Sequence, residues 1–539
     1  MSLLSAVPAI GETEEVVVTP SAGGALTAVE QFAEYHDHVL APGGRRYRDL
    51  IPTERPGPGH QYAFEVDLDA CTGCKACVAA CHSLNGLEDG ETWRSVSLLH
   101  RGTAAEPVLQ TVTASCHHCL DPACLRGCPV DAYEKDPLTG IVRHLDDQCI
   151  GCRYCTLSCP YEVPAYEPRR GIVRKCDMCH GRLEAGEAPA CVQGCPNEAI
   201  SIAVVDVAAS RAAAESGMSV PGAAPSFITG PTTVYVGSRR EALTRGAPSP
   251  EPTGPAHDHP PLAVMLVLTQ LAVGAFVIGL IRAVIGGGSG PAPAVDAGLA
   301  VASGALALAA SVFHLGRPRY AHRAVIGLRH SWLSREIVAF GGFTGLAVLY
   351  AAVVASRLRL PAGWTETLGW LAASSGATAV ACSVMIYATT RRASWRVGTV
   401  ASRFGLSGVV CGSAALAWAA VVTTGPGSAR PLLVLVAAAA ALKLAGEATV
   451  FLPGRPADHA DRVRRARLLK QDLRPRVVTR FGLGALSGVV LPLAAVWLSA
   501  GAHPAALPAA LLASGALGGC VAAEYAERSL FFTTASAPR

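Results

Sequence analysis

The amino-acid sequence predicts two parts of different fold class, an α+β head rich in cysteine and then an all-α membrane domain of eight transmembrane helices. Sixteen of the nineteen cysteines lie between Cys71 and Cys195. After Pro260 the chain consists of long runs of Ala, Val, Leu and Gly with few charges. A chain of 539 residues also exceeds the size at which one hydrophobic core usually stops growing.

The elements follow in order along the chain. Residues 1–60 form an N-terminal extension, in which only 26–37 has the apolar spacing of a short helix. The head is expected at 61–205, with the strand-like stretches "YAFEVDL" and "AISIAVV" at its two ends. Residues 206–260, rich in Pro and Gly, are predicted to be a linker with one possible strand, "TTVYV". The membrane domain covers 261–539.

Eight apolar stretches make up the membrane domain. Each is close to the roughly 20 residues that a helix needs to cross the hydrocarbon layer. Buried helices of a soluble protein could imitate one or two of them, but eight in succession favour a membrane domain. The predicted spans are 262–281, 295–315, 336–355, 368–389, 405–424, 431–452, 481–500 and 505–525.

The basic residues between the spans predict the topology. With eight spans, both termini and the loops after the second, fourth and sixth helices share one face. Those loops hold 18 Lys and Arg residues, against 4 in the other loops, which predicts a cytoplasmic head and cytoplasmic termini. The missing secretory signal agrees, although some of these arginines could instead dock the head or a partner. We expect a multi-pass protein of a bacterial or archaeal cell membrane that binds lipid and no nucleic acid.

Four blocks of four cysteines recur in the head. The first and third share the spacing C-x2-C-x2-C-x3-C, the second has four residues in its middle gap, and the fourth has eleven. The blocks are Cys71, Cys74, Cys77 and Cys81; Cys116, Cys119, Cys124 and Cys128; Cys149, Cys152, Cys155 and Cys159; and Cys176, Cys179, Cys191 and Cys195.

This spacing is typical of iron–sulfur clusters. Three thiolates on one tight loop can bind three irons of a cubane, while the fourth, in a new backbone direction, ligates the neighbouring cluster. The pattern predicts a ferredoxin-like domain, doubled because there are four blocks. Zinc sites rarely crowd three thiolates in this way, and disulfides would need an oxidising compartment. Gly73 and Gly151 suit a close approach of backbone amides to a cluster, and Lys75 and Arg153 would offset its charge or lie in solvent.

The stretch from Cys149 to Ile200, which begins "CIGCRYCTLSCPYEVPAYEP", resembles the four-cluster electron-transfer subunit of the dimethyl sulfoxide reductase family of molybdenum enzymes. The resemblance covers about 61–205 and implies four [4Fe-4S] clusters and a separate molybdopterin catalytic subunit. One departure is that His82, not proline, follows Cys81. The implied ligand sets are Cys71, Cys74 and Cys77 with Cys195; Cys176, Cys179 and Cys191 with Cys81; Cys116, Cys119 and Cys124 with Cys159; and Cys149, Cys152 and Cys155 with Cys128. The last two sets are expected in the middle of the electron route.

Residues 311–336, "SVFHLGRPRYAHRAVIGLRHSWLSRE", resemble the membrane anchor of the same reductases, which reacts with menaquinone or ubiquinone without haem. His314, at the head-side end of the second span, could accept a quinol proton or cap its helix. Glu336 begins the third span, where a carboxylate must be partnered or proton-active. Arg319 and Arg323 could hold a quinone oxygen, stabilise Glu336 or bind lipid phosphate. Most histidines after Pro260 lie near helix ends or loops, which independently disfavours haem b.

The sequence therefore predicts a fused subunit that oxidises membrane quinol and passes electrons through four clusters to a molybdopterin subunit. Reverse flow from a formate-type dehydrogenase is an alternative, as is an electron module of a nitrate, polysulfide or hydrogenase complex. In the sixth span, Lys443 and Glu447 are expected to pair with each other, and a proton path is the sharper alternative. A conformational ion pump would require more intramembrane acids than Glu336 and Glu447, the chief ones in the sequence.

Overall fold

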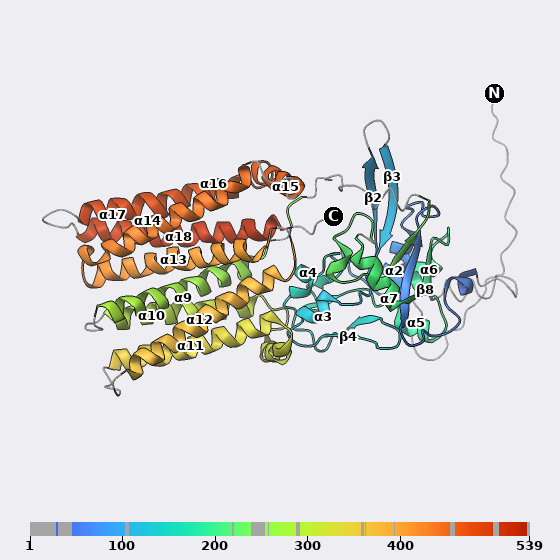
Figure 1. Cartoon of the computed structure of the whole chain (residues 1–539), viewed down its shortest axis with the longest axis horizontal. Helices are drawn as coiled ribbons and strands as arrows, with labels where there is room; N and C mark the ends of the chain where they lie inside the picture. The colour runs from blue at the N-terminus through green and yellow to red at the C-terminus, as the bar shows by residue number, and fades with distance from the viewer. Residues whose placement is uncertain are drawn as a thin grey trace, which may run out of the picture.

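The computed structural model joins a compact head to one end of a helical bundle (Figure 1). It describes residues 29–30, 46–102, 107–217, 220–238, 254–256, 258–286, 292–356, 361, 363–392, 394–452, 459–499 and 506–535. The short helix predicted at 26–37 lies outside the described residues, except for residues 29 and 30, which are helical. The α+β head and the helical membrane part confirm the predicted fold class.

A three-stranded sheet closes the end of the head that is remote from the bundle. Strand β1 (His60–Asp67) pairs antiparallel with β8 (Ile200–Asp206) and parallel with β9 (Val234–Val236). The two strands predicted at the ends of the head therefore lie side by side. Because β1 offers its second edge to β9, the chain returns to the head after β8 instead of leaving it.

The segment 206–260, predicted to be a linker, thus contributes structure to the head. It contains α7 (Val207–Glu215), the 3-10 turn η2 (Ser226–Ile228) and β9. Tyr235 of β9 is fully buried, and its hydroxyl donates to the Thr113 carbonyl at 3.2 Å. Within the described part of this segment, up to residue 238, the Pro and Gly residues lie in turns between elements of the head.

A short helix lies within each cysteine block of the head, and these helices pack in two pairs. Helix α2 (Ala76–Leu84) of the first block packs on α6 (Ala190–Gln193) of the fourth, and α3 (Ala123–Gly127) packs on α4 (Tyr154–Ser158). The head is therefore a double unit, as the four blocks predict. The other elements are η1 (Arg46–Leu50), α5 (His180–Glu184), and the hairpins β2 (Ser95–Gly102) with β3 (Pro107–Ala114), β4 (Tyr133–Lys135) with β5 (Val142–His144), and β6 (Ala165–Glu167) with β7 (Ile172–Arg174).

Within the described part of the chain, eight helices are long and apolar enough to cross a membrane. They are α9 (Pro260–Ile285), α10 (Ala292–Phe313), α11 (Trp332–Ser356), α12 (Trp364–Ala388), α13 (Val397–Thr423), α14 (Pro426–Ala448), α16 (Arg474–Ala485) continued through the π-helical turn Leu486–Val490 into α17 (Leu491–Ser499), and α18 (Ala506–Thr533). Shorter helical segments are η3 (Pro318–Arg329), η4 (Thr449–Phe451) and α15 (His459–Lys470).

Glycines allow the two halves of the bundle to approach closely. Helix α9, from the first half, crosses α13, from the second, and a Cβ on Gly274 would stand 2.0 Å from the Gly408 carbonyl oxygen. Close backbone approach through small residues is a common basis of helix association in membranes.

The eighth span is longer than predicted. Helix α18 runs to Thr533 instead of ending near residue 525, so Glu524, Glu527 and Arg528 lie within it. A scan for apolar runs ends the span at these charges, but all three side chains are buried in ion pairs among neighbouring helices.

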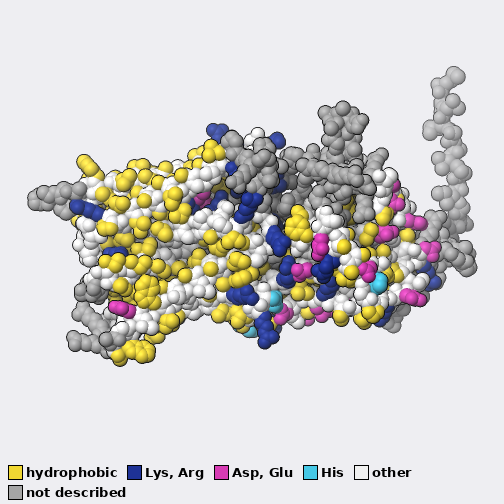
Figure 2. Space-filling view, viewed as in Figure 1, with side chains coloured by type: hydrophobic (Ala, Val, Ile, Leu, Met, Phe, Trp, Pro, Cys, Tyr) yellow, Lys and Arg dark blue, Asp and Glu magenta, His cyan; other side chains and the backbone are white. Residues whose placement is uncertain are grey.

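Basic side chains gather where the head meets the bundle, whereas the bundle surface is largely apolar (Figure 2). Several of these arginines contact the head. Arg317 Nη1 donates to the Asp146 carbonyl at 2.8 Å, Arg323 Nη1 to the Asp147 carbonyl at 2.9 Å, and Arg392 Nη2 to the Leu157 carbonyl at 3.1 Å. Part of the basic bias between the spans therefore serves docking of the head.

Candidate metal centres and the membrane junction

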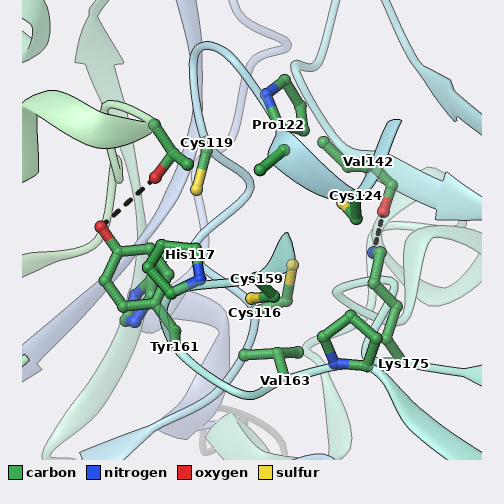
Figure 3. Close-up of a pocket in the computed structure, with 14 residues that line it drawn as sticks. Cys116, His117, Cys119, Pro122, Cys124, Val142, Cys159, Tyr161, Val163 and Lys175 are labelled. Atoms are coloured by element: carbon green, nitrogen blue, oxygen red, sulfur yellow. Dashed lines mark hydrogen bonds between the residues drawn. The ribbon is translucent and has the colours of Figure 1, made fainter. Parts of the chain in front are cut away.

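Two cavities of the head are each lined by one complete predicted cysteine set. Cys116, Cys119, Cys124 and Cys159 surround a cavity of about 370 Å³ (Figure 3). Cys71, Cys74, Cys77 and Cys195 line another, of about 280 Å³. In both cases the distant cysteine joins three from another block, as expected when the last thiol of a block turns away from its neighbours.

The other two predicted sets also come together. Cys128 lies within electrostatic range of its expected partners Cys149, Cys152 and Cys155. Cys81 lies within electrostatic range of its expected partners Cys176, Cys179 and Cys191. The members of these two sets therefore lie near one another, and electrostatic range also joins cysteines of different sets, such as Cys176 and Cys116.

The loops that carry these cysteines have a repeated backbone conformation. Gly73 and Gly151 have φ of 75° and 69°, and the residues two positions later, Lys75 and Arg153, are also left-handed, with φ of 65° and 59°. Each loop curls tightly, so that backbone N–H groups turn toward sulfur: the Gly151 amide donates to Cys149 Sγ at 3.4 Å. Such amide bonds to sulfur tune an iron–sulfur centre.

The geometry suits iron–sulfur clusters better than the alternatives. All nineteen cysteines are unpaired, which removes the disulfide interpretation. No three His, Cys, Asp or Glu side chains among the described residues close around a single metal ion, as zinc would require. Burial raises the pKa of Cys128 and Cys159 to about 11, so that both would be protonated at pH 7 unless a bound metal favoured the thiolates.

The four sets follow one another in a row. Cys77, of the first-block set, interacts electrostatically with Cys191, and Cys176 of the fourth-block set interacts with Cys116. Tyr133 lies in electrostatic range of both Cys124 and Cys155 and so connects the second-block and third-block sets. The order is first, fourth, second, third.

Backbone contacts place the third-block set directly on the membrane domain. Gly316 and Arg317 donate their amides to the Gly151 and Ile150 carbonyls at 3.3 and 3.0 Å. The expectation that this set stands in the middle of the electron route is therefore wrong, because it occupies the membrane end of the row. The order of the blocks in the sequence does not tell which cysteine set lies nearest the membrane domain, and only the tertiary contacts show it.

Two histidines of the anchor bind backbone carbonyls of predicted ligand cysteines. His314 Nε2 lies 3.0 Å from the Cys152 carbonyl oxygen, and His330 Nε2 lies 3.0 Å from that of Cys128. A carbonyl only accepts, so Nε2 of His314 donates and Nδ1 remains as the acceptor of its ring. Burial and the charges of Arg153 and His259 lower the pKa of His314 to about 4, so the ring is neutral at pH 7.

Three glycines fit the head to the membrane domain at van der Waals distance. A Cβ on Gly316 would stand 2.1 Å from the Gly171 carbonyl oxygen, and one on Gly151 would stand 2.2 Å from the same atom. Backbone meets backbone at this point, and no other residue type would fit.

Tyr154 was not identified from the sequence as a junction residue. It lies between two ligand cysteines, is buried, and donates its hydroxyl to the Ile386 carbonyl of α12 at 2.7 Å. Its ring packs in an aromatic cluster that includes Tyr387, Trp395 and Phe531. An aromatic residue in the two-residue gap of a cysteine block was the available signal, but its partner lies more than 200 residues away.

Glu336 and the two arginines proposed beside it occupy different surroundings. Glu336 is buried in α11 and accepts a hydrogen bond from Ser383 of α12. Glu336 also lies in electrostatic range of Tyr154. Glu336 and His314 therefore both lie near the segment of the head that carries Cys152 and Tyr154. Arg323 binds the head at the Asp147 carbonyl, and Arg319 is exposed. The structure thus directs Arg323 to the head surface.

The fold and these sites define an electron-transfer protein built into an integral membrane anchor. Residues 255–532, more than half of the chain, match the family model described as DMSO reductase anchor subunit (DmsC). Residues 108–205 match a 4Fe-4S dicluster domain. The chain therefore belongs to the DMSO reductase anchor subunit family, with an iron–sulfur domain fused ahead of the anchor.

Similar proteins cover the head. The B subunit of the anaerobic dimethyl sulfoxide reductase of Haemophilus influenzae is 34% identical over 183 residues, which are 32% of this chain and 88% of that protein. The corresponding B subunit of Escherichia coli is 37% identical over 154 residues, 27% of this chain and 75% of that protein. The hydrogenase-2 operon protein HybA of E. coli is 38% identical over 171 residues, 27% of this chain and 52% of that protein. The fused iron–sulfur and anchor arrangement predicted from the sequence is confirmed.

Proposed function

We propose that the chain oxidises membrane quinol and passes the electrons through four [4Fe-4S] clusters to a separate molybdopterin catalytic subunit. The main support is the junction, where His314 bonds the Cys152 carbonyl at 3.0 Å and Glu336 lies near Tyr154. A quinol oxidised between these side chains would stand next to the membrane-side ligand set. The sixteen grouped cysteines are the proposed iron ligands, and the names of the dimethyl sulfoxide reductase relatives support the partner.

Each side chain at the proposed quinol site has a definite task. The free Nδ1 of His314 accepts a hydrogen bond from one quinol hydroxyl and orients the ring. The Glu336 carboxylate, held by Ser383, takes a proton as the quinol loses its electrons. When bound, the clusters supply one-electron carriers.

The proposed topology keeps the head and both termini in the cytoplasm. The basic loops after the second, fourth and sixth spans support this orientation, although the arginines that dock the head reduce the weight of the count. We propose that the head extends through β9 at Val236 and that the anchor begins with α9 at Pro260.

A second candidate function is transfer of electrons to quinone from a hydrogenase-type or formate-type partner. The likeness of the head to HybA supports it, and nothing in a row of one-electron carriers fixes the direction of flow. Purification of the native complex and identification of its large subunit separates the two. A molybdopterin protein supports the first function, and a hydrogenase subunit supports the second.

The quinol site is tested with the variants His314→Ala and Glu336→Gln in the assembled complex. We expect cluster reduction by menaquinol to slow by about 100-fold, because His314→Ala removes the hydrogen-bond acceptor that orients the quinol and Glu336→Gln removes the proton acceptor, while dithionite still reduces every cluster. His322→Ala, an exposed position in η3, is the matched control. Wild-type rates in both variants would rule out this quinol site.

The number of clusters is measured on the purified chain. Four [4Fe-4S] clusters require about sixteen irons per chain. Iron and acid-labile sulfide well below that number, or zinc in equal amount to the chain, would contradict the four-cluster proposal.

A further inference from the structure

A buried ionic network occupies the second half of the membrane domain, apart from the proposed quinol site. Its members come from five helices and carry charges of both signs. They are Gln270 of α9, Arg403 and Ser407 of α13, Lys443 and Glu447 of α14, Arg480 of α16, and Glu524, Glu527 and Arg528 of α18. Neither the proposed quinol site nor the cluster row uses any of them.

The expected pairing of Lys443 with Glu447 is only a minor part of this network. Those two groups are 3.8 Å apart, whereas Lys443 makes a much closer ion pair with Glu524. Arg480 bonds Glu524 at 3.0 Å and binds both carboxylate oxygens of Glu447 at 2.8 Å. Residue 524 lies within the predicted span 505–525, but the sequence pattern does not show that Glu524 pairs with Lys443 and Arg480 of other helices.

Hydrogen bonds connect the network from one side to the other. Arg528 Nη2 donates to Ser407 Oγ at 2.8 Å and to Gln270 Oε1 at 2.7 Å. Ser407 in turn donates to Glu524, which Arg480 connects to Glu447. Glu447 stands one residue before the end of α14, so the chain of bonds reaches the face of the bundle that the head covers.

Such a network needs a physical reason to exist within a membrane. Each buried charge is costly there, and a buried ion pair often stabilises a protein less than apolar packing of the same volume. Stability alone therefore does not account for the ionic network. Ionisable groups within membrane spans commonly mark proton or ion pathways.

Tyr387 connects the network with Glu336. It lies one helical turn beyond Ser383, which donates to Glu336, and it is in electrostatic range of both Glu336 and Arg528. Tyr387 and Arg528 also pack on the same ring, that of Phe404, with a centroid separation of 5.8 Å for Tyr387 and a Cζ-to-centroid distance of 4.3 Å for Arg528. Tyr387 therefore lies in range of both the proposed proton acceptor of the quinol and the ionic network, and bound water would complete a path between them.

Two further features suit a site that holds water. Within the described residues no acceptor lies in hydrogen-bond range of Arg528 Nε or Gln270 Nε2, although both atoms are buried, and buried donors without a protein partner commonly bind water. A narrow cavity borders Glu524 and Arg480 and reaches Gly488 in the π-helical turn. Such π turns frequently occur at functional sites.

We propose that this network is a proton-transfer site, which receives the protons released at Glu336 and delivers them through Glu447 to the water on the head side. The inference rests on the proposed quinol oxidation, in which each quinol yields quinone, two electrons and two protons. The electrons enter the cluster row one at a time, and the protons leave through the network. Lysine and arginine remain charged, so the carriers are the carboxylates, the hydroxyls of Tyr387 and Ser407, and bound water.

The test removes single hydroxyls from this route. Tyr387→Phe and Ser407→Ala are compared with Tyr350→Phe and Ser413→Ala, which remove the same groups elsewhere in the bundle. Tyr350 is buried and lies about 21 Å from Glu336 along α11. Ser413 is also buried, and among the described residues its hydroxyl donates to the carbonyls of Val409 and Val410 in its own helix.

The assembled complex is mixed with menaquinol in an anaerobic stopped-flow instrument. Cluster bleaching reports electrons, and a pH-indicator dye reports protons. We expect proton release to slow by about tenfold or more in both route variants, with a larger solvent isotope effect, and to stay at the wild-type rate in both controls. Dithionite-reduced EPR spectra check that every variant is assembled, and if one variant does not assemble, the other decides.

Two negative results have different meanings. Wild-type proton release in the assembled route variants would overturn the proton-transfer site and leave quinol oxidation intact. If menaquinol does not reduce the clusters of the wild-type complex while dithionite does, the proposed function itself fails.

Discussion

The glycine contact at the junction allows a quantitative test of how the head is held. In Gly316→Ala the new Cβ would stand 2.1 Å from the Gly171 carbonyl oxygen, so the two backbones must separate by about 1 Å to reach ordinary contact. That shift breaks the amide bonds of Gly316 and Arg317 to the Gly151 and Ile150 carbonyls and the bond of His314 to Cys152. At about 1 kcal/mol each, the docked state loses about 3 kcal/mol, a factor of about 100 in its equilibrium constant.

The assay compares hydrogen exchange and electron transfer in the same preparation. We expect faster amide exchange at residues 316 and 317 in Gly316→Ala, together with slower menaquinol-driven cluster reduction and unchanged reduction by dithionite. Gly298→Ala in α10 is the control, since its Cβ would meet nothing within 4 Å. Wild-type exchange and wild-type quinol rates in Gly316→Ala would refute the view that this close approach holds the head.

Three further predictions concern the clusters and the junction. Cys159→Ser should damage the second-block cluster and spare the third-block one, which EPR of the reduced protein distinguishes; loss of the third-block cluster would contradict the exchanged ligand sets. Tyr154→Phe should lower the opening free energy of the junction by about 1 kcal/mol, measured by hydrogen exchange, and an unchanged value would mean that the 2.7 Å bond to Ile386 contributes nothing. Arg94→Met removes a buried cation in electrostatic range of Cys77 and Cys191. The reduction potentials of the first-block and fourth-block clusters should therefore fall by about 70 mV, which is the effect of one charge at roughly 10 Å in a medium of dielectric constant near 20. Potentials equal to wild type in a redox titration would disprove this role.

The ligand sets could be predicted from the sequence because their information is local. The spacing within each of the first three blocks brings three thiols close together in the sequence, and the family resemblance supplies the fourth ligand of each set. The contacts α2 with α6 and α3 with α4 arise from the same repeat. The known family pattern supplies the exchange of the last cysteine, and the cavities lined by Cys159 and Cys195 agree with it.

The junction could not be predicted, since its information is spread over distant segments. Gly151 was singled out for the cluster loop and not for docking, Gly171 and Gly316 look like ordinary loop glycines, and only their meeting in the fold reveals the junction. The network around Glu524 was missed for a different reason: Glu524 lies within the predicted eighth span, but its partners Lys443 and Arg480 stand on other helices, and no sequence pattern pairs them.

The anchor holds the head mainly through the backbone of its cluster loops. His314 and His330 bind the carbonyls of Cys152 and Cys128, and the Gly327 amide binds that of Pro129 at 2.9 Å. These carbonyls point at the anchor only while the loops keep their tight left-handed form, which a bound metal stabilises. Docking and cluster binding are therefore thermodynamically linked, and each must strengthen the other by the same factor. A head without its membrane-side cluster should dock weakly on the anchor to which it is fused, so that the proposed quinol site stands against the head mainly when the head is able to conduct.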